Sequence, residues 1–164
     1  MKKFLLTALS LLILSSCGYT MAGLNNEVPV KYYINTVHND TIDSTIGDIV
    51  QLEAERFFLK YNELASYKQA TYFMDIMISN LEYVNPILTA TDQATATYIS
   101  YNMTIVVTDI DGKEIYTWNT TTSTSFSITS NVARTLQTRD RKLKSNIEDD
   151  LTTFRLRISR KVYK

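Results

Sequence analysis

The clearest pattern along the chain is an alternation of apolar and mainly polar positions between Tyr98 and Asp109, with Val106 as an apolar member of the polar set. A period of two predicts a strand that turns one face to a core and the other to solvent. Asp111-Gly112 then predicts a hairpin turn, and the residues from Glu114 to Ser127 predict the returning strand. The apolar members of the alternating strand are Ile99, Tyr101, Met103, Ile105 and Val107.

Two segments carry the three-and-four spacing of an amphipathic helix. The first begins at Ile42 and continues to Leu64, with Asp40 or Thr41 as its cap after a turn at 38–41. Gly47 lies inside it, and we expect the helix to cross a neighbour closely there. The second begins at Asn131, Thr138 or Asp140. Its apolar stripe is Leu143, Ile147, Leu151, Phe154, Ile158 and Val162.

Two further strands complete the set. Val30 to Thr36 is rich in β-forming residues and predicts a first strand. Tyr72 to Val84 has apolar residues on both faces, which predicts a central strand that ends at Asn85-Pro86, with residues 85–95 as a loop. One face would carry Met74, Ile76 and Ile78, and the other Met77, Leu81 and Tyr83.

The predicted order is β-α-β-β-β-α. Strands in a run with helices beside them predict an α+β two-layer sandwich. We expect a four-stranded, mostly antiparallel sheet with two helices packed on one face, formed by a single domain over residues 30–164.

The beginning of the chain has the pattern of an export signal. Lys2 and Lys3 precede an apolar run from Phe4 to Leu14, which is too short to span a bilayer comfortably. Ser15, Ser16 and then Cys17 follow, which resembles a bacterial lipobox. Residues 1–16 would be the lipoprotein signal peptide, Cys17 the lipidated first residue, and 17–29 a tether. The alternative is an ordinary signal peptide with a chance cysteine.

The residue composition and the net charge exclude several classes of site and function. Cys17 is the only cysteine, so an internal disulfide and a cysteine zinc site are excluded, and we expect no metal and no cofactor. Removing residues 1–16 leaves a net charge of −2, which does not suit nucleic acid. His38 is the only histidine, and no nucleophile-elbow motif accompanies it. We therefore expect no catalytic residues and no enzyme.

The stretch Cys17-Gly18-Tyr19-Thr20-Met21-Ala22-Gly23 resembles the mature start of LptE-type lipopolysaccharide-assembly lipoproteins. The element order and the hairpin over 104–118 are also similar to that family. The resemblance implies an outer-membrane lipoprotein, lipid-anchored at the periplasmic face. Its partners would be an LptD-type β-barrel, which it plugs and helps to assemble, and lipopolysaccharide, whose insertion into the outer leaflet it assists. Gly18 fits sorting to the outer membrane.

The resemblance also implies basic residues that engage lipopolysaccharide phosphates. No Lys or Arg lies between Lys68 and Lys113, which departs from the family pattern. Lys113 at the hairpin tip is the best match, and Arg134 and Arg139 are weaker candidates. The alternative is that all three are solvated surface residues.

Two hypotheses remain open. The Thr- and Ser-rich run from Thr117 to Ser130 is either an edge strand that pairs with a barrel wall or a plain polar edge strand. A periplasmic activator of a peptidoglycan synthase is the alternative function. Such activators usually need a long tether to cross the periplasm. Residues 17–29 span at most ~3.5 Å each, which is too short for that distance and favours the LptE-type function.

Overall fold

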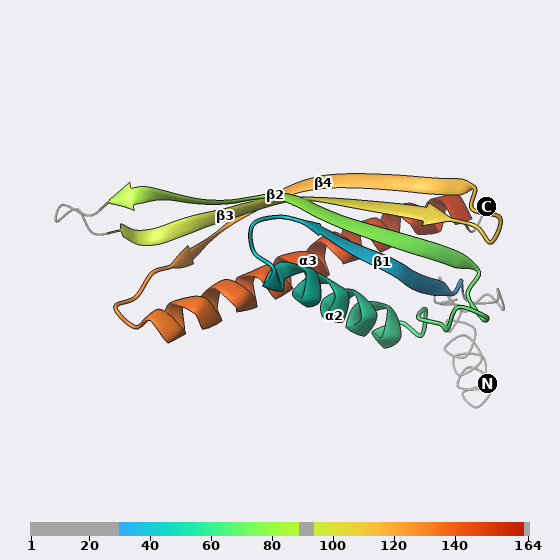
Figure 1. Cartoon of the computed structure of the whole chain (residues 1–164), viewed down its shortest axis with the longest axis horizontal. Coiled ribbons are helices and arrows are strands. Elements are labelled where there is room, and N and C mark those ends of the chain that lie inside the picture. Colours follow the sequence, from blue (N-terminus) through green and yellow to red (C-terminus); the bar gives the residue numbers. More distant parts are fainter. Residues whose placement is uncertain (1–29, 89–93, 163–164) are drawn as a thin grey trace, which may run out of the picture.

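The computed structural model describes residues 30–88 and 94–162, with the backbone alone for 84–88 and 94–95. Its elements are β1 (Tyr32–Asp40), α2 (Thr45–Lys60), β2 (Tyr72–Leu88), β3 (Ala94–Thr108), β4 (Glu114–Ser127) and α3 (Val132–Val162). The four strands form one sheet in the order β1-β2-β3-β4. The pair β1–β2 is parallel and the other pairs are antiparallel. Both helices lie on one side of the sheet (Figure 1), so the predicted fold class is confirmed.

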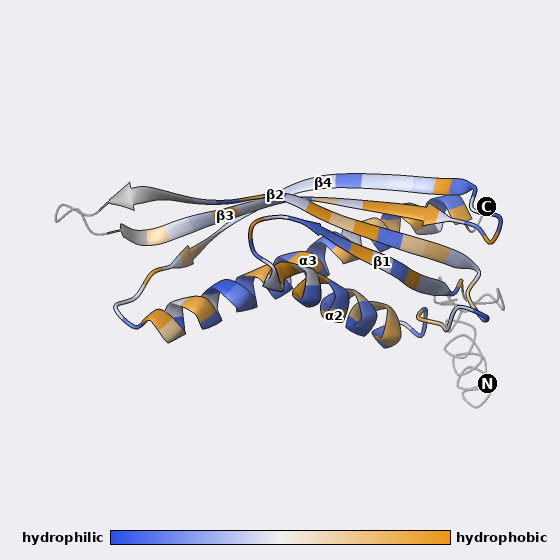
Figure 2. Ribbon diagram, viewed as in Figure 1, coloured by the Kyte–Doolittle hydropathy of each residue, from blue (hydrophilic) through white to orange (hydrophobic). Residues whose placement is uncertain are grey.

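The core lies between the sheet and the two helices. All five apolar positions of the alternating strand are fully buried, as its period of two predicts. Figure 2 shows that apolar and polar residues alternate along the strands and that the helices are amphipathic. Phe154 of α3 connects the two layers, because its ring lies 6.0 Å from that of Trp118 and 6.4 Å from that of Phe58.

The strand β1 is longer than the sequence predicts. Residues 38–40, expected to form a turn, continue the strand because Met77, Ile78 and Ser79 of β2 lie beside them as pairing partners. A register shift between Ile34 and Thr36 resets the alternation. Such a bulge places Asn35 out of phase with its neighbours and hides the continuation of the strand from pattern analysis.

The helix α2 begins three residues later than predicted. Its apolar residues Ile46, Val50, Ala54, Phe57 and Phe58 are buried as expected. Ile42, however, precedes the helix and is exposed. The N-cap residue is Ser44, and its side chain makes no cap bond. Asp43, one residue earlier, takes over this role in place of Asp40 or Thr41, because its carboxylate accepts bonds from the N–H and the hydroxyl of Thr45 (3.0 and 2.7 Å).

The two faces of β2 differ from the prediction at one point. Met74, Ile76 and Ile78 face the core. Between Ser79 and Glu82 the register shifts, and Asn80 adopts a positive φ of 53°. This bulge inserts an extra residue, so Leu81 is buried on the same side as Ile78 instead of facing away with Met77. Tyr83 follows Leu81 to the side of the helices, where its hydroxyl bonds Asp43.

The hairpin between β2 and β3 is also longer than predicted. Asn85-Pro86 does not end β2, which continues to Leu88, and β3 begins at Ala94. The register shifts between Val84 and Ile87. Proline has no N–H to donate and is tolerated at such irregularities. The paired strands extend past β1 and α2 as an arm (Figure 1).

The helix α3 takes the earliest of the three predicted starts. The Asn131 side chain accepts the N–H of Arg134 (3.0 Å), which is the geometry of an N-cap. The predicted stripe from Leu143 to Ile158 is buried. Asp150 is buried with it, and its carboxylate accepts bonds from the hydroxyls of Tyr101 and Thr122 (both 2.9 Å). These bonds fix the position of α3 along β3 and β4.

Gly47 lies where α2 passes β1, as its place in the pattern predicts. A Cβ added at Gly47 would lie 3.1 Å from the Cβ of Asn39. Asn39 cannot withdraw easily, because its side chain bonds Asp43 O (2.8 Å) and Thr41.

We therefore expect Gly47→Ala to lower the free energy of unfolding by about 1 kcal/mol, because overpacking exceeds the helix-propensity gain. Urea unfolding followed by circular dichroism measures this. An increase in stability would show that the crossing is looser than the structure indicates.

The buried Asp150 generates a second prediction. Burial raises the pKa of Asp150, although the bonds from Tyr101 and Thr122 oppose the rise. Tyr101→Phe removes one donor to a buried carboxylate and should lower the free energy of unfolding by about 1.5–3 kcal/mol at pH 7. The loss should shrink as the pH falls through the raised pKa of Asp150, since a protonated carboxyl needs that donor less.

Urea titrations at several pH values measure the effect. Tyr116→Phe is the matched control, because Tyr116 is half-buried but its hydroxyl makes no hydrogen bond within the described residues. Equal losses for the two variants would contradict a specific role for the bond to Asp150.

Candidate functional site

The face of the sheet that the helices leave uncovered is the candidate site. The side chains on this outer face are the strand neighbours of the buried core residues, so they alternate with them along each strand. Cross-strand pairing arranges them in rows across the sheet. One row is Asp40, Ser79, Asn102 and Thr121, the next is His38, Met77, Thr104 and Asn119, and the third is Thr36, Asp75, Val106 and Thr117.

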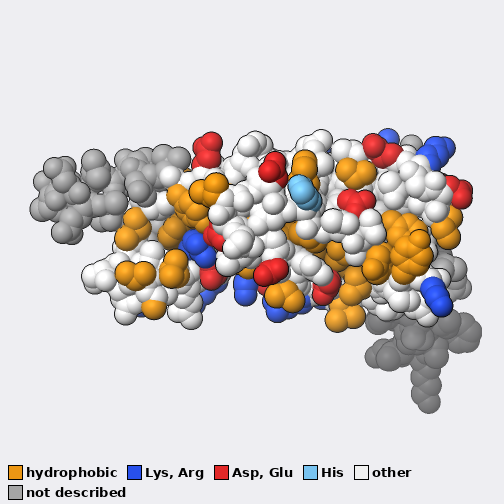
Figure 3. Space-filling view, in the orientation of Figure 1, with side chains coloured by type: hydrophobic (Ala, Val, Ile, Leu, Met, Phe, Trp, Pro, Cys, Tyr) orange, Lys and Arg blue, Asp and Glu red, His pale blue; other side chains and the backbone are white. Residues whose placement is uncertain are grey.

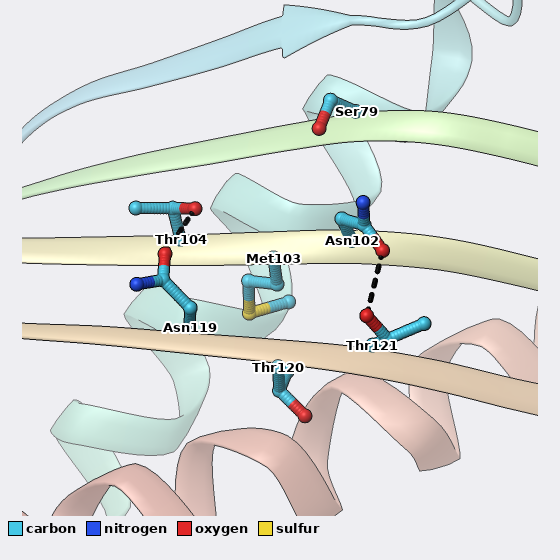
Figure 4. Close-up of a pocket in the computed structure, with 7 residues that line it drawn as sticks. All are labelled: Ser79, Asn102, Met103, Thr104, Asn119, Thr120 and Thr121. Carbon is cyan, nitrogen blue, oxygen red and sulfur yellow. Dashed lines mark hydrogen bonds between the residues drawn. The ribbon is translucent and has the colours of Figure 1, made fainter.

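Hydroxyl and amide side chains bond one another along this face. The Thr121 hydroxyl donates to the Asn102 side-chain oxygen (2.9 Å), and the Thr104 hydroxyl donates to that of Asn119 (2.7 Å). Figure 4 shows both bonds running between β3 and β4. The hollow there is lined by Ser79, Asn102, Met103, Thr104, Asn119, Thr120 and Thr121. The bonds hold the side chains in place through the amide oxygens, and within the described part of the chain the amide N–H groups of Asn102 and Asn119 have no bonding partner.

The charge on this face is low and of one sign. The three rows contain Asp40 and Asp75 and no Lys or Arg, and Asp75 accepts a bond from Asn35 (2.9 Å). In Figure 3, the Lys and Arg side chains in view gather beside the helices and at the end where β1 starts and α3 ends. The outer face is therefore suited to a polar, uncharged partner more than to a phosphate.

A small apolar area lies within the polar rows. Met77 and Val106 line a hollow with His38, Thr36 and Asp75. Farther along β1, the rings of Tyr33, Tyr67 and Phe73 pack together with centroids 4.9–6.1 Å apart. Aromatic groups of this kind are common at protein interfaces.

The strand β4 forms an unprotected edge of the sheet. Edge strands are usually guarded by charges, proline, bulges or short length. From Ile115 to Ser127 there is no charged residue and no proline, and the pairing with β3 is regular from Tyr116 onward. Among the described residues, no backbone hydrogen bond outside the β3–β4 ladder involves β4. Part of α3 is visible past this edge in Figure 4, so a strand added to β4 would lie over the helix.

The predicted lipopolysaccharide ligands do not come together. Lys113 lies exposed in the turn between β3 and β4, where Gly112 has a φ of 77° and the Asp109 carboxylate accepts the N–H of Lys113 (2.9 Å). Arg134 lies exposed in the first turn of α3, at the opposite end of the fold. Phosphate binding by either residue stays a prediction.

Arg139 is held inside the protein by carboxylates. Its guanidinium contacts Asp43 (3.2 Å) and Asp140 (2.8 Å), and its side chain is only 18% exposed. The Tyr83 hydroxyl also donates to Asp43 (3.3 Å). Asp43, Tyr83 and Arg139 therefore tie the start of α2, the β2–β3 arm and α3 together, and a lipid phosphate at Arg139 would have to displace these carboxylates.

Burial alone would raise the pKa of Asp43. The bonds from the Thr45 hydroxyl and N–H, the charge of Arg139 and the Tyr83 hydroxyl outweigh burial, so the pKa is lowered. Asp43 consequently stays ionised at neutral pH and keeps its ion pair with Arg139.

The remaining predictions on site residues have varied outcomes. Cys17 and its lipidation lie outside the described residues. His38 lies on the outer face of β1, and among the residues described no three His, Cys, Asp or Glu side chains are placed to hold a metal ion. No helix in the described part of the chain has the length and apolar character needed to cross a membrane.

Sequence reasoning found the hydroxyl-rich strand but missed two arrangements. It did not predict that side chains of β4 share the outer face of the sheet with Asn102, Thr104 and Met77. The alternation along β3 could have indicated this, because it assigns Asn102 and Thr104 to the face away from the core. It also missed the contact of Asp43 with Arg139, which are 96 residues apart. No local pattern could have revealed that pair.

Comparison with known proteins shows the fold and nothing more specific. No family model matches the chain, and no curated protein matches it. A protein of the family DUF330 from Xanthomonas campestris is similar in structure, with 11% identity over 77% of this chain and 86% of its own, at a TM-score of 0.51.

Two lipoproteins have weaker structural similarity. Rare lipoprotein B from Shewanella oneidensis is 14% identical over 76% of this chain and 99% of its own, with a TM-score of 0.47. Lipoprotein B from Nitrosomonas europaea is 13% identical over 82% and 88%, also at 0.47. Because their identities and TM-scores are this low, these two similarities add nothing about the fold to the comparison with the DUF330 protein.

The contact between Asp43 and Arg139 generates a pH-dependent prediction. Asp43→Asn keeps an acceptor for the Thr45 N–H but removes the charge, so it should lower the free energy of unfolding by about 1 kcal/mol at pH 7. Because the folded pKa of Asp43 is lowered, its charge stabilises the fold above pH ~3.8, the ordinary value. The difference between the two proteins should disappear as the pH falls through the lowered pKa.

Urea unfolding between pH 7 and pH 2.5 checks this prediction. Asp48→Asn is the control, because Asp48 lies in the first turn of the same helix. This variant also loses a favourable interaction with the helix dipole, but Asp48 has no arginine partner among the described residues. A difference that persists undiminished at the lowest pH would contradict the ion-pair explanation.

Proposed function

We propose that this chain is a non-enzymatic outer-membrane lipoprotein, anchored through acyl chains on Cys17, that seats its sheet inside an LptD-type β-barrel. In that position it assists barrel assembly and the insertion of lipopolysaccharide into the outer leaflet. The proposal combines the lipobox and the Cys17-Gly18-Tyr19 opening with the arrangement of the domain.

The single observation that carries the proposal is the uncovered outer face of the sheet. A barrel lumen is lined by polar residues, and a plug needs a rigid surface that can exchange hydrogen bonds with such a lining. The bonded Thr and Asn side chains of β3 and β4 meet this need, since they are polar and uncharged and lie on paired strands.

The unprotected edge of β4 supports the same partner. A regular strand without charges or proline can accept another strand along its length by β-addition. A barrel wall or an inward-folded barrel segment supplies strands of this kind, which agrees with the edge-strand hypothesis from the Thr117–Ser130 run. Lys113, in the turn that begins β4, is the residue we propose to meet an anionic glycolipid, as a point charge.

The proposal leads to a direct test in the native host. The tagged chain, extracted from membranes in mild detergent, should bring down a large β-barrel protein. Thr121→Arg places a charge in the middle of the outer face. A barrel that covers this face would strip the charge of water, so the variant should abolish this co-purification. The fold should be affected little, because Thr121 is exposed.

Thr152→Arg is the matched control, because Thr152 is an exposed threonine on α3, away from the outer face. This variant should retain the barrel. The proposal fails if the wild-type chain brings no barrel, or if Thr121→Arg and Thr152→Arg retain it equally.

A further inference from the structure

One end of the domain brings together the entry of the chain, a cluster of cations and two exposed apolar side chains. We call it the anchor end, and define it by the start of β1 at Tyr32, the loop 65–71, the turn 109–113 and the last turn of α3. The strands β1 and β2 start there, β3 ends there and β4 starts there. The C-terminal part of α3 lies at the same end. Its Arg155 pairs with the carboxylate of Glu63 (2.7 Å), and the Glu63 carbonyl in turn accepts the N–H of Tyr32 at the start of β1 (2.8 Å).

Cations outnumber carboxylates at the anchor end. Its exposed cations are Lys68, Lys113, Arg160 and Lys161, and none of them belongs to an ion pair among the described residues. The carboxylates are Asp109, Asp111 and Glu114. Two of these are engaged, since Asp109 accepts two backbone N–H groups and Glu114 accepts the Thr117 hydroxyl (2.7 Å).

Two large apolar side chains are exposed at the anchor end, each close in sequence to one of its lysines. Ile110, in the turn beside Lys113, is 76% exposed, and Tyr67, in the loop beside Lys68, is 61% exposed. The Tyr67 ring is held from behind by Tyr33 and Phe73 (5.5 and 4.9 Å). Tyrosine together with Lys and an aliphatic side chain is the composition that binds at the boundary between lipid headgroups and acyl chains.

The length of the tether limits which end can reach the membrane. Residues 17–29 span at most ~45 Å when fully extended, and they join the domain at the anchor end. The 17 residues of β2 extend for roughly 55 Å. The far end of β2, at the tip of the β2–β3 arm, is thus farther from the chain entry than the tether can reach. The start of α3 lies about 46 Å from the last turn of that 31-residue helix, so only a fully extended tether could bring it to the membrane, whereas the anchor end needs almost none of that length.

We propose that the anchor end is a membrane-contact surface, which seats on the anionic phospholipids of the leaflet that holds the acyl chains. Ile110 and Tyr67 enter the headgroup region, and the surrounding Lys and Arg side chains face lipid phosphates. The inference rests on the anchoring through Cys17 that we propose above. Contact of the anchor end with the membrane would set the orientation of the domain when no barrel is bound.

The test reads the environment of single positions on the acylated chain reconstituted in vesicles. Cys17 is the only natural cysteine, and its sulfur would be blocked by lipid. A cysteine introduced by Ile110→Cys can therefore be labelled selectively with an environment-sensitive fluorophore. Val132→Cys is the matched control, because Val132 is 72% exposed but lies at the opposite end.

In vesicles that contain phosphatidylglycerol, the label at position 110 should brighten and shift to the blue, and the label at 132 should not. Replacing Lys68, Lys113 and Lys161 by Gln should weaken seating about fivefold for each charge removed, and added salt should act in the same direction. Replacing Arg134, Arg141 and Lys142 by Gln should leave the signal unchanged.

The possible failures are distinguishable. If the chain floats with the vesicles but both labels respond alike, the orientation is wrong while the anchor stands. If the label at 110 responds only after lipopolysaccharide is added, the surface recognises that glycolipid and the assignment to phospholipid is overturned. If the chain does not float at all, anchoring through Cys17 is wrong, and this inference fails with it.

Discussion

Burial of one face of a four-stranded sheet by two helices is the constraint on which the rest of this structure depends. The chain has no disulfide available to its domain, so the apolar faces of β2 and β3 must be covered by α2 and α3. Phe154 connects the layers, and the bonds from Tyr101 and Thr122 to Asp150 set the position of α3. A core that needs only one side of the sheet leaves the other side free for a partner.

This division explains why the outer face and the edge of β4 are so polar. Side chains there contribute little to the core, since hydroxyl and amide groups remain partly exposed and bond mainly to one another. A surface that is polar, low in charge and rigid stays soluble and can still exchange hydrogen bonds with a wall of similar chemistry. The Lys and Arg side chains in view lie elsewhere, beside the helices and at the anchor end.

The two proposals assign different tasks to different parts of one domain. The outer face and β4 would contact a barrel, whereas the anchor end would contact the leaflet that holds the acyl chains. Lys113 belongs to the anchor end and directly precedes the edge strand, which begins at Glu114, so it lies where a lipid surface and a barrel partner would meet. Arg139, by contrast, has a structural role, because Asp43 and Asp140 hold it between α2 and the arm.

The sequence by itself determined the elements whose pattern is local. The alternation of β3, the stripe of α3 and the turn at Gly112 follow from periodicity and from backbone preference, and they identified the layers and the buried residues. Tertiary structure decided the rest. The bulges at Asn35 and Asn80, the extension of β1 to Asp40 and the capture of Arg139 by Asp43 depend on partners that lie 18 to 96 residues away along the chain. A local pattern cannot contain them, because the pairing that stabilises each one exists only after the strands and helices have packed.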